Sequence, residues 1–419
     1  MTLERDTAHG VGRRRVRWLA GTTAIALLCA CASYRQVEVS PLAPSKGEVP
    51  LPCEPGWDAR LLLDTGETGI WTVEAVPVFD CYATPEVVGL DDEGRCHVLV
   101  SYSGKWTPLS RIHDGQWLGG LAHGEVDQRI AGRELYVGGQ RGNLYQLVPF
   151  PNGALDGRLI ARFPGREIHT IVAGELDPQN DTRELLVFTR PGALFRVTPN
   201  GPHGRFETEE IAELPARVRH AVLLPPEAGP RRIVTAARDG SLRILSLSDV
   251  GPSWEDIMRE SMGVGRVALR RDLGPDELVL YSTLDDGRVL RHEKFGARWT
   301  SELIYAGPPG PRGIASGRFH ADPDAESVAV FGYSGKVQVL TRCDRGAWEV
   351  ETIFRDRDRG HWLSVAELDG RNSTDEIVGS GYGGRIFMLA RPPGFGLGSI
   401  PTDRDAPPRH VEVPHANVL

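Results

Sequence analysis

The chain has 419 residues, 40% hydrophobic and 25% charged, an ordinary globular composition long enough for one large repetitive domain or two to three small ones. Its 49 glycines and 31 prolines against 4 methionines favour many short strands over long helices, so we expect an all-β protein. The formal charge of −8 argues against a nucleic-acid partner, because phosphate recognition needs a basic face.

Residues 1–30 have the pattern of a targeting segment. Four arginines between Arg13 and Arg17 precede an apolar run, Trp18–Ala30, that is too short to cross a bilayer. The run ends in Leu-Cys-Ala-Cys at Cys31, which resembles a bacterial lipobox. That resemblance implies a lipoprotein signal peptide and acyl chains on Cys31, and Ala32 then favours the outer membrane, facing the periplasm. The alternative is an ordinary secretory signal with two unrelated cysteines.

The segments that flank the body differ from it in composition. Residues 1–30 hold five arginines and two acids, a net charge of +3, so the remainder carries −11 rather than −8. Residues 31–56 are rich in Ser, Pro and Gly without periodicity, which predicts a tether. Residues 393–419 have the same signature, and we expect an extended or disordered tail there.

Four cysteines lie beyond the lipobox, namely Cys53, Cys81, Cys96 and Cys343. In an oxidising compartment they would form one or two disulfides, and three complete pairings are open. Their spacing includes no C-x-x-C element, so it does not predict a zinc site.

The body repeats. Seven segments share one form: an apolar strand, a turn that usually contains glycine, and a second strand whose apolar residues alternate with polar ones. Equivalent positions are 48, 50, 48, 45, 49 and 50 residues apart. They are Glu86, Glu134, Glu184, Arg232, Glu277, Glu326 and Glu376.

One of the turns, GSGYGG at Gly379–Gly384, matches the dinucleotide-binding pattern G-x-G-x-x-G. That pattern binds a pyrophosphate only when a strand leads in and a helix N-terminus leads out. No helix signal follows here, and the equivalent turns, such as GGQRG and AARDG, do not keep the pattern. We therefore predict a hairpin turn rather than a nucleotide site.

Each hairpin is flanked by two further strand-like segments, which gives four strands in a unit and seven units. This arithmetic predicts a seven-bladed β-propeller over residues 57–392. The last unit lacks a fourth strand, but WDARLLLDT at Trp57 resembles the fourth strand AWEVETIF of the preceding unit. We expect this N-terminal strand to complete the last blade and close the ring.

Segments such as ELDGRNSTDEIVGSGYGG, from Glu367, resemble the FG-GAP or VCBS-like repeats of extracellular propellers. The resemblance implies a seven-bladed propeller used for recognition or scaffolding. It also implies calcium binding by acidic loops, for which Asp369, Asn372 and Asp375 are candidates, with Asp177, Asn180 and Asp181 in a second loop. Both loops depart from the family pattern in spacing and lack its bracketing glycine, so a solvated polar loop is the alternative.

The innermost strand of each unit brings one residue to a similar height in the predicted central funnel. Aligned on the strand starts, these residues are Ile70, Gly119, His169, His220, Arg266, Arg312 and His361, with Trp71, Arg219 and Trp362 beside them. Five of the seven are basic, which predicts a local positive potential that attracts an anionic ligand. Two alternatives stay open: a transition-metal site built from His169, His220 and His361, and a wet channel mouth without a ligand.

No motif for a catalytic nucleophile, zinc protease or phosphate-binding loop occurs in the sequence. We therefore expect a monomeric, non-catalytic, lipid-anchored binding or scaffolding module of the bacterial cell envelope, without a required cofactor. Its partner would be a protein, a glycan or a small anion at the funnel. The alternative function is an envelope hydrolase or lyase that works with a histidine-bound metal in the funnel.

Overall fold

A computed structural model describes residues 49–395, except residues 67, 80–81, 83, 103–104, 131, 151–153, 177–182, 201–203, 226–231, 249–250, 271–272, 274–276 and 344–345. The described residues belong to one compact unit, Val37–Leu419. The predicted signal peptide, the lipidation site Cys31 and the second acidic loop (Asp177, Asn180 and Asp181) lie outside the described residues.

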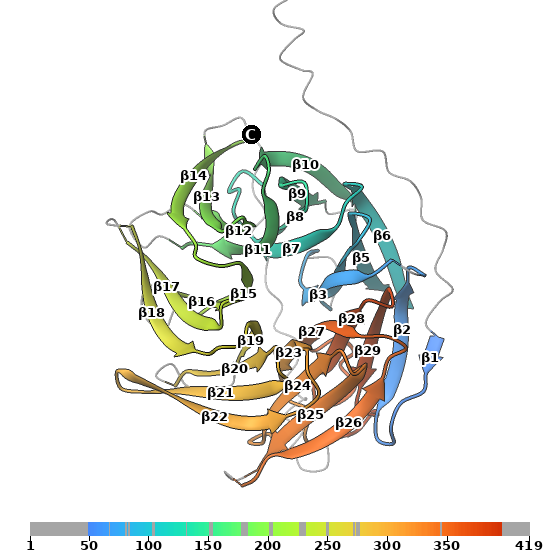
Figure 1. Ribbon diagram of the computed structural model, residues 1–419. Helices are drawn as coiled ribbons and strands as arrows, with labels where there is room; N and C mark the ends of the chain where they lie inside the picture. Colours follow the sequence, from blue (N-terminus) through green and yellow to red (C-terminus); the bar gives the residue numbers. More distant parts are fainter. Residues whose placement is uncertain are drawn as a thin grey trace, which may run out of the picture. The chain divides into compact units, whose positions relative to one another are not determined.

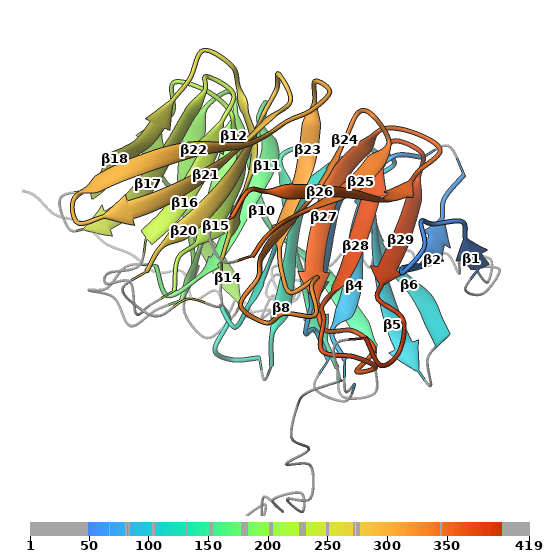
Figure 2. The same cartoon turned by 90° about the horizontal axis from the view of Figure 1, so that it is seen from below.

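Seven antiparallel sheets surround a common axis, which confirms the predicted seven-bladed β-propeller (Figure 1). Each sheet runs outward from the axis (Figure 1), and the side view shows strands of neighbouring blades next to one another (Figure 2). No helix in the described part of the chain is long and apolar enough to cross a membrane.

The strands take four positions, from the axis to the rim. The inner strands are β3 (Ile70–Val76), β7 (Leu118–Gly124), β11 (Glu167–Gly174), β15 (Val218–Leu223), β19 (Val264–Leu269), β23 (Pro311–Ser316) and β27 (Gly360–Ala366). The second strands are β4 (Glu86–Asp91), β8 (Glu134–Gly139), β12 (Glu184–Arg190), β16 (Arg232–Ala237), β20 (Val279–Leu284), β24 (Glu326–Gly332) and β28 (Glu376–Gly381). The third strands are β5 (Arg95–Tyr102), β9 (Asn143–Pro149), β13 (Ala193–Asn200), β17 (Ser241–Ser248), β21 (Arg288–Phe295), β25 (Lys336–Arg342) and β29 (Arg385–Ala390). The outer strands are β6 (Lys105–His113), β10 (Leu155–Arg162), β14 (Arg205–Glu213), β18 (Gly251–Arg259), β22 (Arg298–Ala306), β26 (Glu349–Arg355) and β2 (Asp58–Asp64), with β1 (Val49–Leu51) beyond β2.

The hydrophobic core lies between neighbouring blades. Second strands such as β4 and β8 are buried along their whole length, whereas every residue of the outer strand β14 is exposed or half-buried. Close packing between blades explains some strand glycines: a Cβ at Gly138 would lie 2.6 Å from the Cδ1 atom of Ile168 in the next blade. The core is therefore divided into layers, and each layer is formed by side chains from two adjacent blades.

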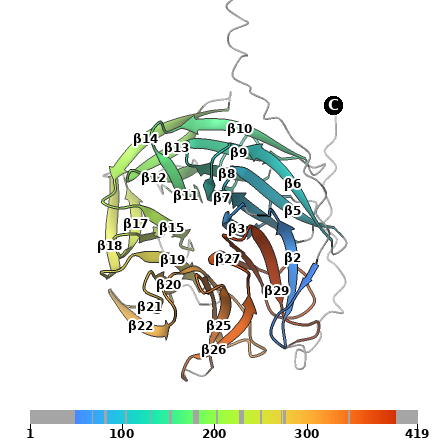
Figure 3. The same cartoon turned by 45° about the vertical axis from the view of Figure 1, so that its right-hand side comes forward.

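The N-terminal strand closes the ring as predicted. Strand β2 pairs antiparallel with β29, from Asp58 opposite Ala390 to Asp64 opposite Arg385, and so completes the seventh blade (Figure 3). Trp57 is buried, its indole N–H donates to Glu351, and the guanidinium of Arg391 stacks 4.0 Å from its ring centroid. Strand β1 adds a fifth strand to this blade.

The GSGYGG segment ends strand β28 with residues 379–381 and forms the turn to β29 with residues 382–384, which confirms the predicted hairpin. Gly384 has a φ of 69°, in the left-handed region that favours glycine. A Cβ there would lie 2.5 Å from the carbonyl oxygen of Thr68, so the site also requires a close backbone approach. These glycines shape a turn, and a strand rather than a helix follows them.

The glutamate that recurs in the repeats has a structural role. In three blades its carboxylate accepts a backbone N–H from the loop that precedes the second strand: Glu86 from Val78, Glu134 from Val126, and Glu376 from Leu368. Burial raises the pKa of Glu134 to about 7 and that of Glu376 to about 8. In these three blades the acid therefore holds a loop in place and is buried rather than exposed to a ligand.

The described cysteines do not form disulfides. Cys53, Cys96 and Cys343 are free, and Cys81 lies outside the described residues. Cys96 is fully buried in the core between the first two blades, where burial raises the pKa of its thiol to about 12.

Removing β2 should destabilise the propeller far more than removing the residues before it. A chain that starts at Val49 keeps the closing strand. One that starts at Thr65 leaves the edge of β29 unpaired and exposes the apolar side chains that pack against Trp57, Ala59, Leu62 and Leu63. We expect the first to melt like the full chain and the second to lose cooperative unfolding or aggregate, as followed by circular dichroism. Similar melting of the two truncated chains would contradict closure by β2.

The Glu376→Gln variant should lose a pH dependence of stability. Because the folded-state pKa of about 8 exceeds the usual 4.5, the unfolded chain releases a proton that the folded chain keeps, and the free energy of unfolding falls as pH rises between these values. Glutamine still accepts the Leu368 N–H but does not titrate. Urea unfolding at pH 5.5 and 8.5 should therefore show a smaller difference for the variant, by more than about 1.4 kcal/mol. Glu277→Gln, which replaces an exposed glutamate just before β20, is the control.

Candidate functional site

Every inner strand contains a β-bulge near its first residues. The register against the second strand shifts by one residue at Trp71 in β3, Gly119 in β7, His169 in β11, Arg219 in β15, Arg312 in β23 and His361 in β27, and between Val264 and Val267 in β19. A bulge inserts an unpaired residue and redirects its side chain. The bulges therefore place a ring of mostly aromatic and basic residues at one end of the axis.

The bulges change the predicted alignment. The alignment on strand starts put Ile70 and His220 at the height of His361, but the bulge residues in their strands are Trp71 and Arg219. His220 lies one residue further along, opposite Ala236, just as Trp362 lies opposite Ser380. The predicted funnel residues therefore occupy two successive levels.

A cavity of about 830 Å³ follows the axis and is lined by all seven inner strands. Four predicted residues form what we call its floor, near the bulges: His169, His220, Arg266 and Trp362. Apolar side chains such as Leu121, Ile171 and Ile314 line the wall. The volume is in the range of small-molecule sites, which combine apolar walls with a few fixed polar groups.

Arg266 is the unusual group of the floor. Its side chain is buried, and its guanidinium stacks 4.3 Å from the ring centroid of Trp362. It donates to the carbonyl oxygen of Gly265, but its Nε has no hydrogen-bond partner and no described carboxylate forms an ion pair with it. A buried charge without a counter-ion is costly, so this position favours an incoming anion.

Further arginines strengthen the positive potential. Arg217, Arg219 and Arg312 join Arg266 in what we call the arginine cluster. Burial and these neighbours lower the pKa of Arg266 well below its usual value. Asp285 compensates only part of this charge, since its Oδ1 lies 2.9 Å from Arg219 and 3.0 Å from Arg312. The Nε atoms of Arg217 and Arg312, like that of Arg266, have no described partner.

The histidines are neutral and do not add to this charge. Burial and the nearby arginines lower the pKa of His169 to about 2 and that of His220 to about 3, and hold that of His361 well below its usual range. His220 accepts the backbone N–H of Val267 at its Nδ1, which leaves the proton on Nε2. The predicted ring of imidazole and guanidinium charges is therefore, at neutral pH, a cluster of arginines with neutral imidazoles.

Two predicted residues, Arg312 and His361, do not line the cavity. His361 Nδ1 is 2.6 Å from the carbonyl oxygen of Trp71, and the two rings lie edge to face at 4.8 Å. Arg312 stacks 5.1 Å from the ring centroid of Tyr333. Both residues instead lie at the bulges of their strands, one level away from the floor residue Trp362.

The three histidines do not converge on a common point. Within the described ranges, the groups of three or more potential ligands with ligand atoms all within 4.8 Å of one another do not include His169, His220 and His361. This geometry gives the hydrolase or lyase alternative no specific support.

The candidate calcium residues make separate contacts in the loop between β27 and β28. Asp369 accepts the N–H of Arg371, Asn372 accepts the N–H of Thr374, and Asp375 accepts the N–H of Arg318. The carboxylates that come within 4.8 Å of one another are those of Asp369, Glu367 and Glu376. Calcium binding stays a prediction.

The sequence analysis did not predict two residues that shape the charge at the floor, Arg217 and Asp285. Arg217 precedes β15, and Asp285 lies in the turn after β20, so no common spacing relates them to the inner-strand positions. The only available signal was the pair of arginines flanking Val218 at the start of an inner strand.

No model of a known protein family and no curated protein matches the chain. Solved propeller structures do match. The BP39L lectin from Burkholderia pseudomallei is 15% identical, with a TM-score of 0.59 over 78% of this chain and 96% of that one. BBS1N, solved in complex with ARL6DN, is 11% identical, with a TM-score of 0.54 over 82% and 97%. The WD40 propeller domain of Doa1 is 10% identical, with a TM-score of 0.52 over 80% and 97%.

At these identities the similarity shows the fold alone. The chain is thus a seven-bladed β-propeller, a fold whose members typically bind or scaffold other molecules.

The funnel histidines should remain neutral between pH 8 and pH 5. Their folded-state pKa values lie below this window because protonation would add charge to a buried, arginine-rich site. NMR of histidine-labelled protein, with signals assigned by single His→Gln variants, should show no titration of His169, His220 or His361. A midpoint above pH 5 for any of them would mean that the imidazoles carry part of the positive charge.

Proposed function

We propose that this propeller is a non-catalytic binding module that takes a small anionic ligand in its axial cavity. One observation carries the proposal: among the described residues, Arg266 is buried at the floor of the cavity without a counter-ion, and its Nε has no hydrogen-bond partner. An anion bound there would receive hydrogen bonds from the guanidinium and offset the repulsion within the arginine cluster.

The arginines at the far end of the cavity provide a contrast. Arg270 lies 3.3 Å from Glu326, and Arg318 lies 3.8 Å from Asp375, so each has a carboxylate partner. A third lining arginine, Arg133, is exposed to solvent, which stabilises its charge. Arg266 is the buried lining arginine for which no carboxylate partner is found among the described residues. We infer that the charged group of the ligand enters first and binds at Arg266.

The walls define the rest of the ligand. Leu121, Ile171 and Ile314 are buried apolar residues of three different blades, and Trp362 offers an indole ring beside Arg266. A carboxylate, sulfate or phosphate on a compact, partly apolar body fits this arrangement better than a bare inorganic ion. A protein or glycan partner would bind at the rim or on the outer faces instead.

The cellular setting belongs to the same proposal. The resemblance of the N-terminal segment to a lipobox supports anchoring through Cys31 in the bacterial outer membrane, facing the periplasm. The acidic-loop repeats support membership of the FG-GAP or VCBS-like propellers. Such a module would capture its ligand in the envelope without chemical conversion.

Replacing Arg266 should separate stability from binding. Arg266→Met keeps a side chain of similar length and removes a buried charge that has no counter-ion in the described part of the chain, so the melting temperature without ligand should stay equal or rise. Thermal shifts with a panel of carboxylates, sulfate and phosphate, at constant ionic strength, should show stabilisation of the wild type and at least tenfold weaker binding by the variant, about 1.4 kcal/mol.

The matched control is Arg288→Met. Arg288 is paired with Glu260 and Asp286, so its loss should leave the response to anions intact. If Arg266→Met keeps the full anion response, or no anion stabilises the wild type, the cavity is not an anion site.

A further inference from the structure

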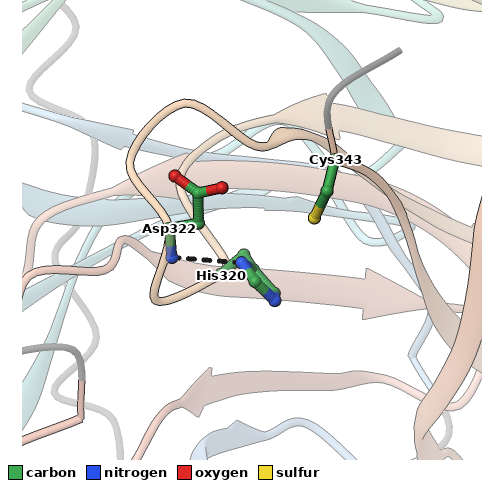
Figure 4. Close-up of side chains that lie close together, drawn as sticks. All are labelled: His320, Asp322 and Cys343. Carbon is green, nitrogen blue, oxygen red and sulfur yellow. Dashed lines mark hydrogen bonds between the residues drawn. The ribbon is translucent and has the colours of Figure 1, made fainter. Parts of the chain in front are cut away.

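A second group of potential ligands lies in the sixth blade, away from the cavity lining. His320 and Asp322 belong to the loop between β23 and β24, and Cys343 directly follows β25. One ligand atom from each side chain lies within 4.8 Å of the other two (Figure 4). None of the three lines the cavity or is used by the proposed function.

The loop is fixed at both ends. Phe319 is fully buried next to His320, and Ala325 is buried just before β24. Inside the loop the N–H of Ala325 donates to the carbonyl oxygen of Asp322, and Asp322 Oδ1 accepts the N–H of Asp324. These contacts hold His320 and Asp322 on one turn, so little ordering is needed before they act together.

Cys343 completes the group from a different segment. It is a free, exposed cysteine held at the end of a strand that is paired on both sides. Figure 4 shows its thiol above the imidazole of His320. Two adjacent segments of one blade thus supply a sulfur, a nitrogen and an oxygen.

This ligand set suits zinc. Zn²⁺ binds thiolate at about 2.3 Å and imidazole or carboxylate at about 2.0–2.2 Å, so tetrahedral ligand atoms are roughly 3.3–3.7 Å apart. The three side chains are exposed or half-buried, and their ligand atoms already lie within 4.8 Å of one another, so small rotations bring them into this range. We propose that His320, Asp322 and Cys343 bind one Zn²⁺, with water as the fourth ligand.

Binding requires two local changes. The thiol of Cys343 loses its proton to solvent and binds as thiolate. The N–H of Asp322 now donates to His320 Nδ1 at 3.1 Å, and an imidazole that binds a metal gives up this bond, whether the metal takes Nδ1 or the proton moves there from Nε2. The half-exposed loop lets water replace the lost partner.

Cobalt binding to the full chain under reducing conditions tests the site. We expect one Co²⁺ per chain, with a thiolate-to-metal absorption band that zinc abolishes by displacement. Cys343→Ser should remove the band, and His320→Gln should weaken cobalt binding at least tenfold. Unchanged melting without metal would show that both variants fold.

Two controls isolate the proposed ligands. Asp324→Asn changes an exposed acid in the same loop, and Cys53→Ser removes another free cysteine, so both should bind cobalt like the wild type. A band that persists in Cys343→Ser, or equal affinity in His320→Gln, would overturn the proposal. Neither outcome bears on Arg266, so the zinc site and the anion site fail independently.

Discussion

The pairing of β2 with β29 is the constraint on which the rest of this protein depends. It joins strands that are more than 300 residues apart and gives the seventh blade its outer strand. Because each core layer lies between two blades, an open seventh blade would expose apolar surface at the seam. The closed ring also brings all seven inner strands to one axis, where seven short segments build a single cavity.

Within that ring, stability and binding use different parts of each repeat. The recurrent glutamates Glu86, Glu134 and Glu376 bind loop N–H groups and are buried, so the most visible signature of the repeat is structural. The inner-strand bulges vary instead from tryptophan through glycine to histidine and arginine. Because the bulge residues face the axis, a change of residue type there alters the central site and leaves the propeller scaffold unchanged.

The cavity floor retains a charge that the fold itself does not neutralise. Asp285 is shared by Arg219 and Arg312, while Arg266 stacks on Trp362 and has no described counter-ion. A solely structural arginine in this position would be expected to have a carboxylate within reach, as Arg270 and Arg318 do. Keeping the neighbouring histidines neutral avoids further repulsion and preserves hydrogen-bonding groups for a ligand.

The sequence by itself determined the number of blades, the four strands in each and the closing role of the Trp57 segment, because strand periodicity and turn residues are local properties that repeat every 45 to 50 residues. It also named the cavity-lining residues His169, His220, Arg266 and Trp362. The tertiary structure decided which level each occupies, since a bulge shifts side-chain direction by one residue and leaves no mark in composition. The tertiary structure alone set the charge states of the histidines, because their burial and the neighbouring arginines come from other blades. It alone brought Cys343 to His320 and Asp322, because the segments next to adjacent strands meet only in the folded blade.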